Sequence, residues 1–139
     1  MSKPTLYVGL DGPLLVPAKH QDTFLKAGIA EYAKPFLHWA TNRFDVRYLT
    51  DRSPGEAFHL SSLLSLPDDA IPVHGFEVSK TEVIKPGHDF YWLDAELIPK
   101  EVAWLAEHGH LNRFLAVDPM VGVRPEHKAA LELLTKKRT

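Results

Sequence analysis

Short apolar stretches that alternate with helical patterns restrict the fold of this chain more than any other feature of its sequence. The stretches are rich in β-branched and aromatic residues and lie at 6–10, 46–50, 90–93 and 114–117, with a weaker one at 71–73. Because they are almost continuously apolar, they suit strands that are buried on both faces of a parallel sheet. The sequence therefore predicts an α/β three-layer sandwich around a doubly wound, mostly parallel sheet of five strands. Ligands of such sheets bind beyond the carboxyl ends of the strands.

Signals for the start of a helix lie between these stretches. Residues 53–56 (SPGE) supply an N-cap serine, a proline at the first helical position and a glutamate three residues after the cap. Residues 79–82 (SKTE) repeat the serine and the glutamate of this capping box. Pro35, Pro99 and Pro125 each precede an apolar pattern with helical spacing. We therefore expect helices between the strands and after the last one.

The composition is that of an ordinary globular protein and excludes several kinds of function. With 139 residues, 45% of them apolar and 24% charged, the chain is expected to form one domain over residues 1–139. The net charge of −2 provides no positive field for nucleic acid or an anionic membrane. The absence of cysteine excludes disulfides and thiolate catalysis. The amino-terminal residues resemble neither a secretory signal nor a membrane span, so a cytoplasmic location is expected.

The first strand ends in the motif that identifies a family. Residues 8–14 read VGLDGPL, which resembles the first motif, D-x-D-G, of the haloacid dehalogenase-like (HAD) phosphatase superfamily. In that family the first aspartate attacks phosphorus and the second handles the proton of the leaving group. Because glycine follows the second aspartate of the motif, Gly12 aligns Asp11 with the acid/base residue. The position of the nucleophile then falls on Gly9, so the nucleophile is absent.

Two further motifs of the family concern the phosphate group. The segment 46–52 (VRYLTDR) is similar to the second motif, which implies that Thr50 binds a phosphate oxygen, with Asp51 beside it. The third motif is a lysine near a helix start that offsets phosphate charge. Lys80 matches it at the first helical position of its capping box, where backbone N–H groups would also face an anion. Lys85 is the alternative for this role.

The fourth motif holds Mg²⁺ through acidic residues after a strand. Here the segment 92–97 reads WLDAEL, so that Asp94 matches the first acid, Ala95 removes the second and Glu96 stands one place further on. The resemblance implies a weakened Mg²⁺ site formed by Asp94, Asp11 and Glu96. All four motifs occur in family order over nearly the whole chain, which predicts a HAD-like, Rossmann-like fold. No inserted stretch is long enough for the cap domain that many members of the family carry, so the resemblance implies a single domain without a cap.

Two functions stay open from the sequence. The one that we favour is a degenerate HAD-like domain that lacks phosphoaspartyl phosphatase activity and binds a phosphorylated small molecule or a protein partner. Its support is the missing nucleophile, because losing such a residue costs on the order of 10⁶ in rate. The alternative is a Mg²⁺-dependent phosphate ester hydrolase in which Asp11, Asp94 or Glu96 orients water for direct attack. The retention of Thr50 and Lys80 favours this alternative.

A third interpretation, a receiver domain of a signalling pathway, does not fit the order of the motifs. Such domains resemble a pattern with the threonine and the lysine after the fourth and fifth strands, whereas Thr50 follows the second predicted strand and Lys80 precedes the fourth. The HAD alignment also suggests a repair. Replacing both Gly9 and Ala95 with aspartate is expected to return two oxygen ligands and to restore Mg²⁺ binding.

Overall fold

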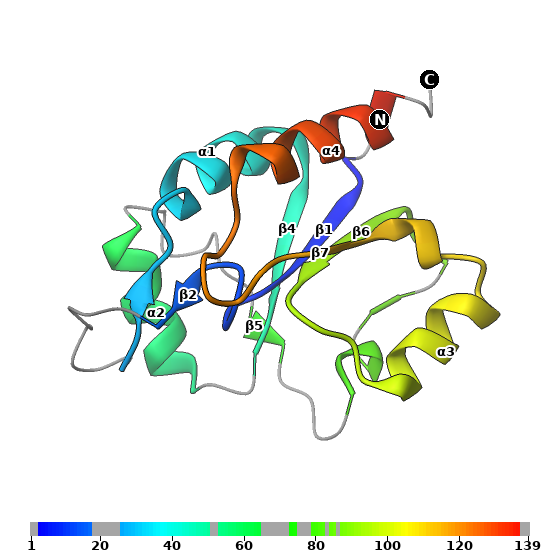
Figure 1. The fold of residues 1–139 in the computed structure, drawn as a ribbon, viewed down its shortest axis with the longest axis horizontal. Helices are drawn as coiled ribbons and strands as arrows, with labels where there is room; N and C mark the ends of the chain where they lie inside the picture. Colours follow the sequence, from blue (N-terminus) through cyan, green and yellow to red (C-terminus); the bar gives the residue numbers. More distant parts are fainter. Residues whose placement is uncertain are drawn as a thin grey trace.

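Five parallel strands form the centre of the protein. The computed structural model describes residues 3–17, 26–50, 53–64, 73–74, 79–82, 84–85 and 87–136. The strands of the main sheet are β1 (Thr5–Gly9), β4 (Asp45–Leu49), β5 (Val73–His74), β6 (Phe90–Asp94) and β7 (Phe114–Ala116). Their spatial order is β5-β4-β1-β6-β7, and every neighbouring pair is parallel. The predicted five-stranded, doubly wound α/β sheet is confirmed (Figure 1).

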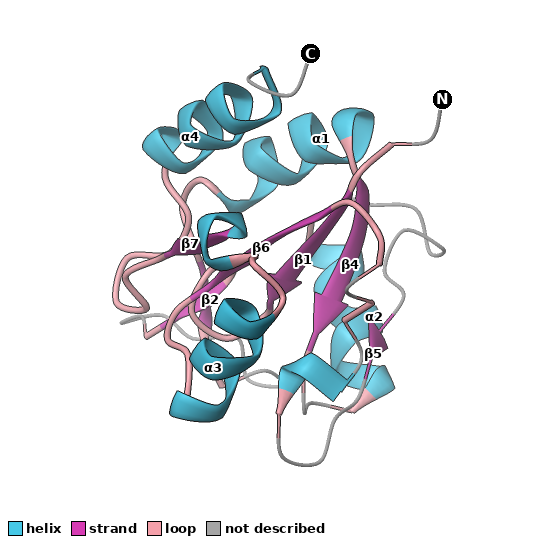
Figure 2. Cartoon of the chain, turned by 90° about the vertical axis from the view of Figure 1, so that its right-hand side faces the viewer, coloured by secondary structure: helices cyan, strands magenta, loops and turns pink. Residues whose placement is uncertain are grey.

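Helices cover both faces of this sheet and make it the middle layer of three. They are α1 (Ala33–Arg43), α2 (Pro54–Leu63), α3 (Pro99–Glu107) and α4 (Pro125–Lys136). Helices α1 and α4 run side by side on one face, and α3 lies on the opposite face (Figures 1 and 2). Among the described residues, no helix is both long enough and apolar enough to cross a bilayer.

Alternation along β1 supplies side chains to two separate cores. Leu6 and Val8 belong to a core that also contains Phe36 of α1 and Leu131 of α4. Tyr7 points to the other face and shares a smaller core with Trp92, Leu105 of α3 and their neighbours. This period-two pattern, with both faces covered, explains why the strands read as continuous apolar runs.

Of the two predicted capping boxes, the first begins an α-helix and the second is followed only by a 3₁₀ turn. At the start of α2, the Ser53 hydroxyl accepts from the amide N–H of Glu56 at 3.2 Å, and the Glu56 carboxylate accepts from the N–H of Ser53 at 3.3 Å. By contrast, the segment that follows Ser79 makes a single 3₁₀ turn, η2 (Lys80–Glu82). The expectation of an α-helix there is wrong, because the described residues form a 3₁₀ turn instead.

A small hairpin that the sequence did not predict lies between β1 and α1. Its strands are β2 (Leu15–Val16) and β3 (Gly28–Ile29), which pair antiparallel. The loop before α4 packs against it, because the N–H of Val123 donates to the carbonyl oxygen of Pro13 at 2.8 Å. Gly122, with a φ of 86°, comes so close that an added Cβ would stand 2.4 Å from the Cβ of Ala30. The hairpin is thereby held beside the carboxyl end of the sheet.

Two buried tyrosines provide a test of this core. The Tyr48 hydroxyl is fully buried and has no hydrogen-bond partner in the described part of the chain. The Tyr7 hydroxyl accepts from the N–H of Lys85 at 3.4 Å. Because an unpaired buried hydroxyl costs free energy, Tyr48→Phe should leave the free energy of unfolding at pH 7 unchanged or raise it by up to about 1 kcal/mol. Tyr7→Phe should lower it by about 1 kcal/mol, and chemical denaturation measures both.

The same pair of variants should differ at alkaline pH. Burial raises the pKa of the Tyr48 hydroxyl well above the ordinary tyrosine value of about 10. Above that value the hydroxyl ionises in the unfolded chain but stays protonated in the folded one, so the protein loses stability as the pH rises from 10 to 12. Tyr48→Phe should reduce this alkaline loss. An alkaline profile identical to that of the unsubstituted protein would contradict the burial of this hydroxyl.

Candidate functional site

The carboxyl ends of three adjacent strands bring the predicted residues to one crevice. Gly9 ends β1, Asp94 ends β6, and Thr50 follows directly after β4. Gly9 pairs with Leu49, and the N–H of Leu10 donates to the carbonyl oxygen of Leu49 at 3.3 Å, which keeps the neighbouring Thr50 beside the end of β1. Both Thr50 and Asp94 are buried, at 3% and 1% exposure. The predicted convergence of strand ends therefore holds for these residues.

The side chain of Asp94 occupies the space that a side chain at position 9 would need. A Cβ added to Gly9 would stand 2.2 Å from Oδ1, 2.5 Å from Cγ and 2.6 Å from Oδ2 of Asp94. These separations are far below van der Waals contact, so any other residue at position 9 forces Asp94 to move. The glycine at position 9 thus leaves β1 without a carboxylate at its end, and the space is filled by the carboxylate of Asp94 from β6.

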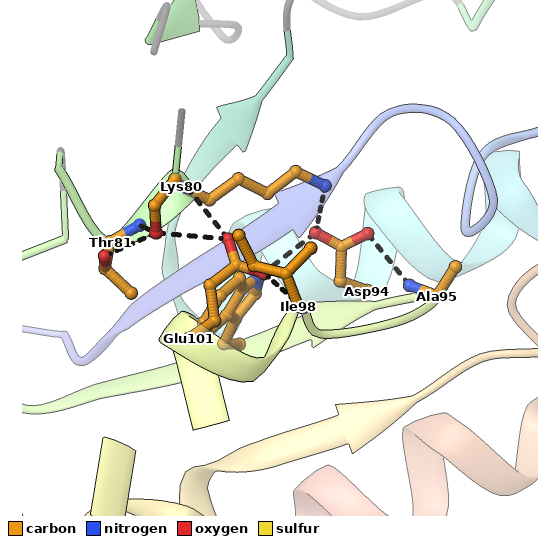
Figure 3. Close-up of polar contacts among 8 residues, drawn as sticks. Lys80, Thr81, Asp94, Ala95, Ile98 and Glu101 are labelled. Carbon is orange, nitrogen blue, oxygen red and sulfur yellow. Dashed lines mark hydrogen bonds and ion pairs between the residues drawn. The ribbon is translucent and has the colours of Figure 1, made fainter. Parts of the chain in front are cut away.

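Three donors hold the Asp94 carboxylate in this place (Figure 3). The ammonium Nζ of Lys80 lies 2.5 Å from Oδ2, and the indole Nε1 of Trp92 donates to the same oxygen at 3.2 Å. The N–H of Ala95 donates to Oδ1 at 2.8 Å. The Asp94 side chain is only 2% exposed and that of Lys80 is 21% exposed, so water does little to screen this ion pair. Lys80, and not Lys85, is therefore the lysine of the crevice.

Glu101 of α3 fixes the backbone that carries Lys80, and sequence reasoning missed it. The buried Glu101 carboxylate accepts from the N–H of Lys80 at 2.9 Å, from the Ser79 hydroxyl at 3.4 Å and from the N–H of Ile98 at 3.0 Å. The N–H of Ser79 donates to Glu82 at 2.8 Å. The prediction that N–H groups here face an anion is wrong, because carboxylates of the chain already take these groups. Glu101 stands three residues after Ile98, a spacing that is typical of a helix cap but carries no signal of the contact with Lys80.

The three predicted carboxylates, Asp94, Asp11 and Glu96, do not gather into one group. Asp11 is exposed and lines a hollow of about 380 Å³. The following Gly12 has a φ of 108°, and a Cβ there would be 2.8 Å from the Cβ of Ala95, so this loop lies against the end of β6. Glu96 is exposed. Asp51, predicted to lie beside the phosphate, is outside the described residues.

Comparisons with known proteins support the fold. No family profile and no curated protein matches the sequence. Two solved structures of the HAD domain of the effector protein Lem4 from Legionella pneumophila do match. An inactive mutant superimposes with a TM-score of 0.64 at 14% identity, over 97% of this chain and 94% of that one. A second structure gives 0.59 at 15% identity, over 96% and 95%. The fold is HAD-like.

The residues of this HAD-like crevice do not fit a divalent cation. The described residues include no group of three or more histidine, aspartate or glutamate side chains placed to share a metal ion, so Asp94, Asp11 and Glu96 do not form such a group. Each oxygen of Asp94 already accepts from at least one donor, and one of those donors is a cation. A Mg²⁺ ion would have to displace the Lys80 ammonium from a buried carboxylate. The predicted Mg²⁺ site of Asp94, Asp11 and Glu96 is therefore not formed.

The repair that the sequence suggested meets the same obstacle. An aspartate at position 9 cannot enter while Asp94 keeps its place, because even a Cβ overlaps its carboxylate. Replacing Gly9 would first break the Lys80–Asp94 ion pair. The double change to aspartate at positions 9 and 95 therefore rebuilds the crevice instead of simply adding two ligands to it.

The ion pair leads to a prediction on Lys80 and Lys85. Lys80→Met removes the ammonium but keeps most of the apolar length of the side chain, and it leaves the Asp94 carboxylate buried without its cation. The free energy of unfolding should fall by about 3 kcal/mol. Lys85→Met, at an exposed side chain, should change it by less than about 0.5 kcal/mol. Equal effects in urea denaturation would show that the ion pair contributes nothing.

A double-mutant cycle tests whether Asp94 fills the space at Gly9. Gly9→Ala should lower the free energy of unfolding by about 2 kcal/mol or more, because the added methyl group displaces the carboxylate. In the background of Asp94→Ala the same change should cost at least about 1 kcal/mol less. Gly87→Ala is the control, since a Cβ there meets nothing within 4 Å. Additive effects of the two substitutions would contradict the overlap.

Proposed function

We propose that this HAD-like domain does not hydrolyse phosphate esters and works instead by binding a small molecule without a divalent cation. The observation that carries the proposal is the Asp94 carboxylate, which stands in the space of the missing nucleophile and is neutralised by Lys80.

Asp94 is a poor substitute for the missing nucleophile. Nucleophilic attack needs the reacting atoms about 3 to 3.5 Å apart and in line. The Asp94 side chain is only 2% exposed, and each of its oxygens already accepts from at least one donor, so it is shielded from a substrate in the crevice. Displacing Lys80 to free an oxygen would leave a buried charge without its partner, which is strongly unfavourable.

The same ion pair weakens the case for a phosphorylated ligand in the closed part of the crevice. A phosphate group needs positive charge, and the Lys80 ammonium is already paired with Asp94. Next to Asp94, a phosphate would also face a buried carboxylate of like charge. A phosphorylated ligand and a protein partner were both expected from the sequence, but the hollow beside Asp11 favours a small molecule, because its 380 Å³ suits a compact ligand.

One observation favours the alternative of a hydrolase without a covalent intermediate. Asp11 is exposed and lines the hollow, so its carboxylate can reach a water molecule or a substrate there. Direct attack by water would still require charge to screen the phosphate. In the described crevice the ammonium of Lys80 is already paired with the carboxylate of Asp94. We therefore place this alternative second.

An activity measurement separates the two functions. With millimolar Mg²⁺ and p-nitrophenyl phosphate, the purified protein should release product no faster than buffer does, because losing the nucleophile costs on the order of 10⁶ in rate. Clear turnover that Asp11→Asn abolishes would overturn the proposal and support direct attack by water.

A metal titration tests the second half of the proposal. The melting temperature should be the same in Mg²⁺ and in EDTA, because Lys80 holds the place of the cation. Lys80→Met is the informative variant, since it removes the cation and one of the two donors from Oδ2 of Asp94 and should make the melting temperature rise with Mg²⁺. A rise in the unsubstituted protein would contradict a metal-independent crevice.

A further inference from the structure

The loop of residues 117–124 joins β7 to α4 and forms part of the wall of the hollow (orange in Figure 1). Pro119 and Met120 are its contribution to that wall. The N–H of Val123 ties the loop to the hairpin by donating to the carbonyl oxygen of Pro13 at 2.8 Å. A histidine closes the base of the loop.

His127, in the first turn of α4, bridges the two ends of this loop. Its Nδ1 accepts from the N–H of Arg124, the residue before α4, at 2.9 Å. Its Nε2 lies 3.2 Å from the carbonyl oxygen of Ala116, the last residue of β7. The backbone N–H of His127 also donates to the carbonyl oxygen of Arg124 at 3.0 Å. The imidazole therefore takes the place that a glutamate or glutamine has in a capping box.

These contacts fix the protonation state of the His127 imidazole. An amide N–H only donates, so Nδ1 must be an unprotonated acceptor toward Arg124. A carbonyl oxygen only accepts, so Nε2 must carry the proton toward Ala116. An imidazolium has a proton on both nitrogens, and the proton on Nδ1 would point at the N–H of Arg124. The closed arrangement thus requires the neutral imidazole.

The surroundings of His127 do not offset the charge that a second proton would add. Within the described ranges its ring forms no ion pair with a carboxylate. The charged or titratable residues of the neighbouring elements are Arg124, Glu126 and Lys128 at the start of α4, Lys34, His38 and Arg43 of α1, Arg113 before β7 and Asp118 after it.

The two acids of this set are engaged or turned away. The Asp118 carboxylate accepts from the N–H of Met120 at 2.9 Å. Glu126 is the residue next to His127 on the helix, and adjacent residues of a helix do not face each other. The amino-terminal end of α4 is also the positive end of its dipole, which disfavours a cation there.

We propose that His127 is a proton-operated clasp at the base of this loop. The neutral imidazole holds Arg124 and keeps the loop closed. As the pH falls and the imidazole takes up a proton, Nδ1 stops accepting and the contact with Arg124 breaks, whereas Nε2 can still donate to Ala116. The freed loop then changes the wall of the hollow that Pro119 and Met120 form. The clasp depends on the fold alone and not on whether the hollow takes a ligand.

Hydrogen exchange of the Arg124 amide, measured by NMR on the full chain at about pH 7.5 and about pH 5, tests the clasp. After correction for the intrinsic exchange rates, its protection should fall about fivefold on acidification, as expected for the loss of one hydrogen bond. The Val117 amide, which donates to the carbonyl oxygen of Asp94 at 2.9 Å, should keep its protection. At the higher pH, the ¹⁵N shifts of the His127 ring should place the proton on Nε2.

Two variants assign the effect to His127. His127→Gln keeps a side chain that can accept from the N–H of Arg124 but does not titrate, so the protection should change by less than about twofold between the two pH values. His88→Gln removes an exposed histidine outside these contacts and should keep the fivefold loss. Circular dichroism shows whether each variant is folded.

Three results would overturn the clasp. They are equal protection of the Arg124 amide at both pH values, the same loss of protection in His127→Gln, or a proton on Nδ1 of His127 at the higher pH. The first and the third are measured on the unsubstituted protein, so they test the clasp even if a variant does not fold.

Discussion

The buried ion pair between Lys80 and Asp94 is the interaction on which the rest of the crevice depends. A carboxylate that is 2% exposed is stable only if its oxygens are matched by donors and its charge by a cation. Lys80, Trp92 and the N–H of Ala95 meet this requirement. The arrangement also needs empty space at the end of β1, and only a residue without a Cβ leaves it, which explains the glycine at position 9.

The ion pair reaches well beyond the strand ends. Its lysine stands on a 3₁₀ turn whose backbone is bound by Glu101, so the amino-terminal end of α3 helps to place the cation next to β6. Glu101 is itself 4% exposed, and its oxygens accept from the N–H groups of both Lys80 and Ile98. Two buried carboxylates are thus tied together through one lysine, which binds Glu101 by its backbone and Asp94 by its side chain.

The crevice consequently has two parts with different properties. The inner part, around Gly9 and Asp94, is closed and its charges are balanced internally. The outer part, beside Asp11 and Lys26, is open, and most of the residues described along its walls are apolar. The motifs that resemble those of the HAD family end in the inner part, so the resemblance implies that the chemistry would occur there. Because the inner part is closed, we expect a ligand of this protein to bind at the outer part.

Local sequence patterns determined the layers, the strands and the candidate residues. Continuous apolar stretches identify buried parallel strands, and the cap at Ser53 and Glu56 forms because both partners lie within one helical turn. Strand ends of a parallel sheet must meet at one edge, so the convergence of Gly9, Thr50 and Asp94 followed from the order of the motifs.

Only the tertiary structure decided how those residues are used. The overlap of Asp94 with the space at Gly9 joins residues 85 positions apart in sequence, and the contact of Glu101 with Lys80 joins residues 21 positions apart. The second contact uses the N–H group of Lys80, which the sequence predicted to face an anion. No periodicity or spacing along the chain encodes such contacts, because they depend on which side chains the packing of β1, β6 and α3 brings within a few ångströms.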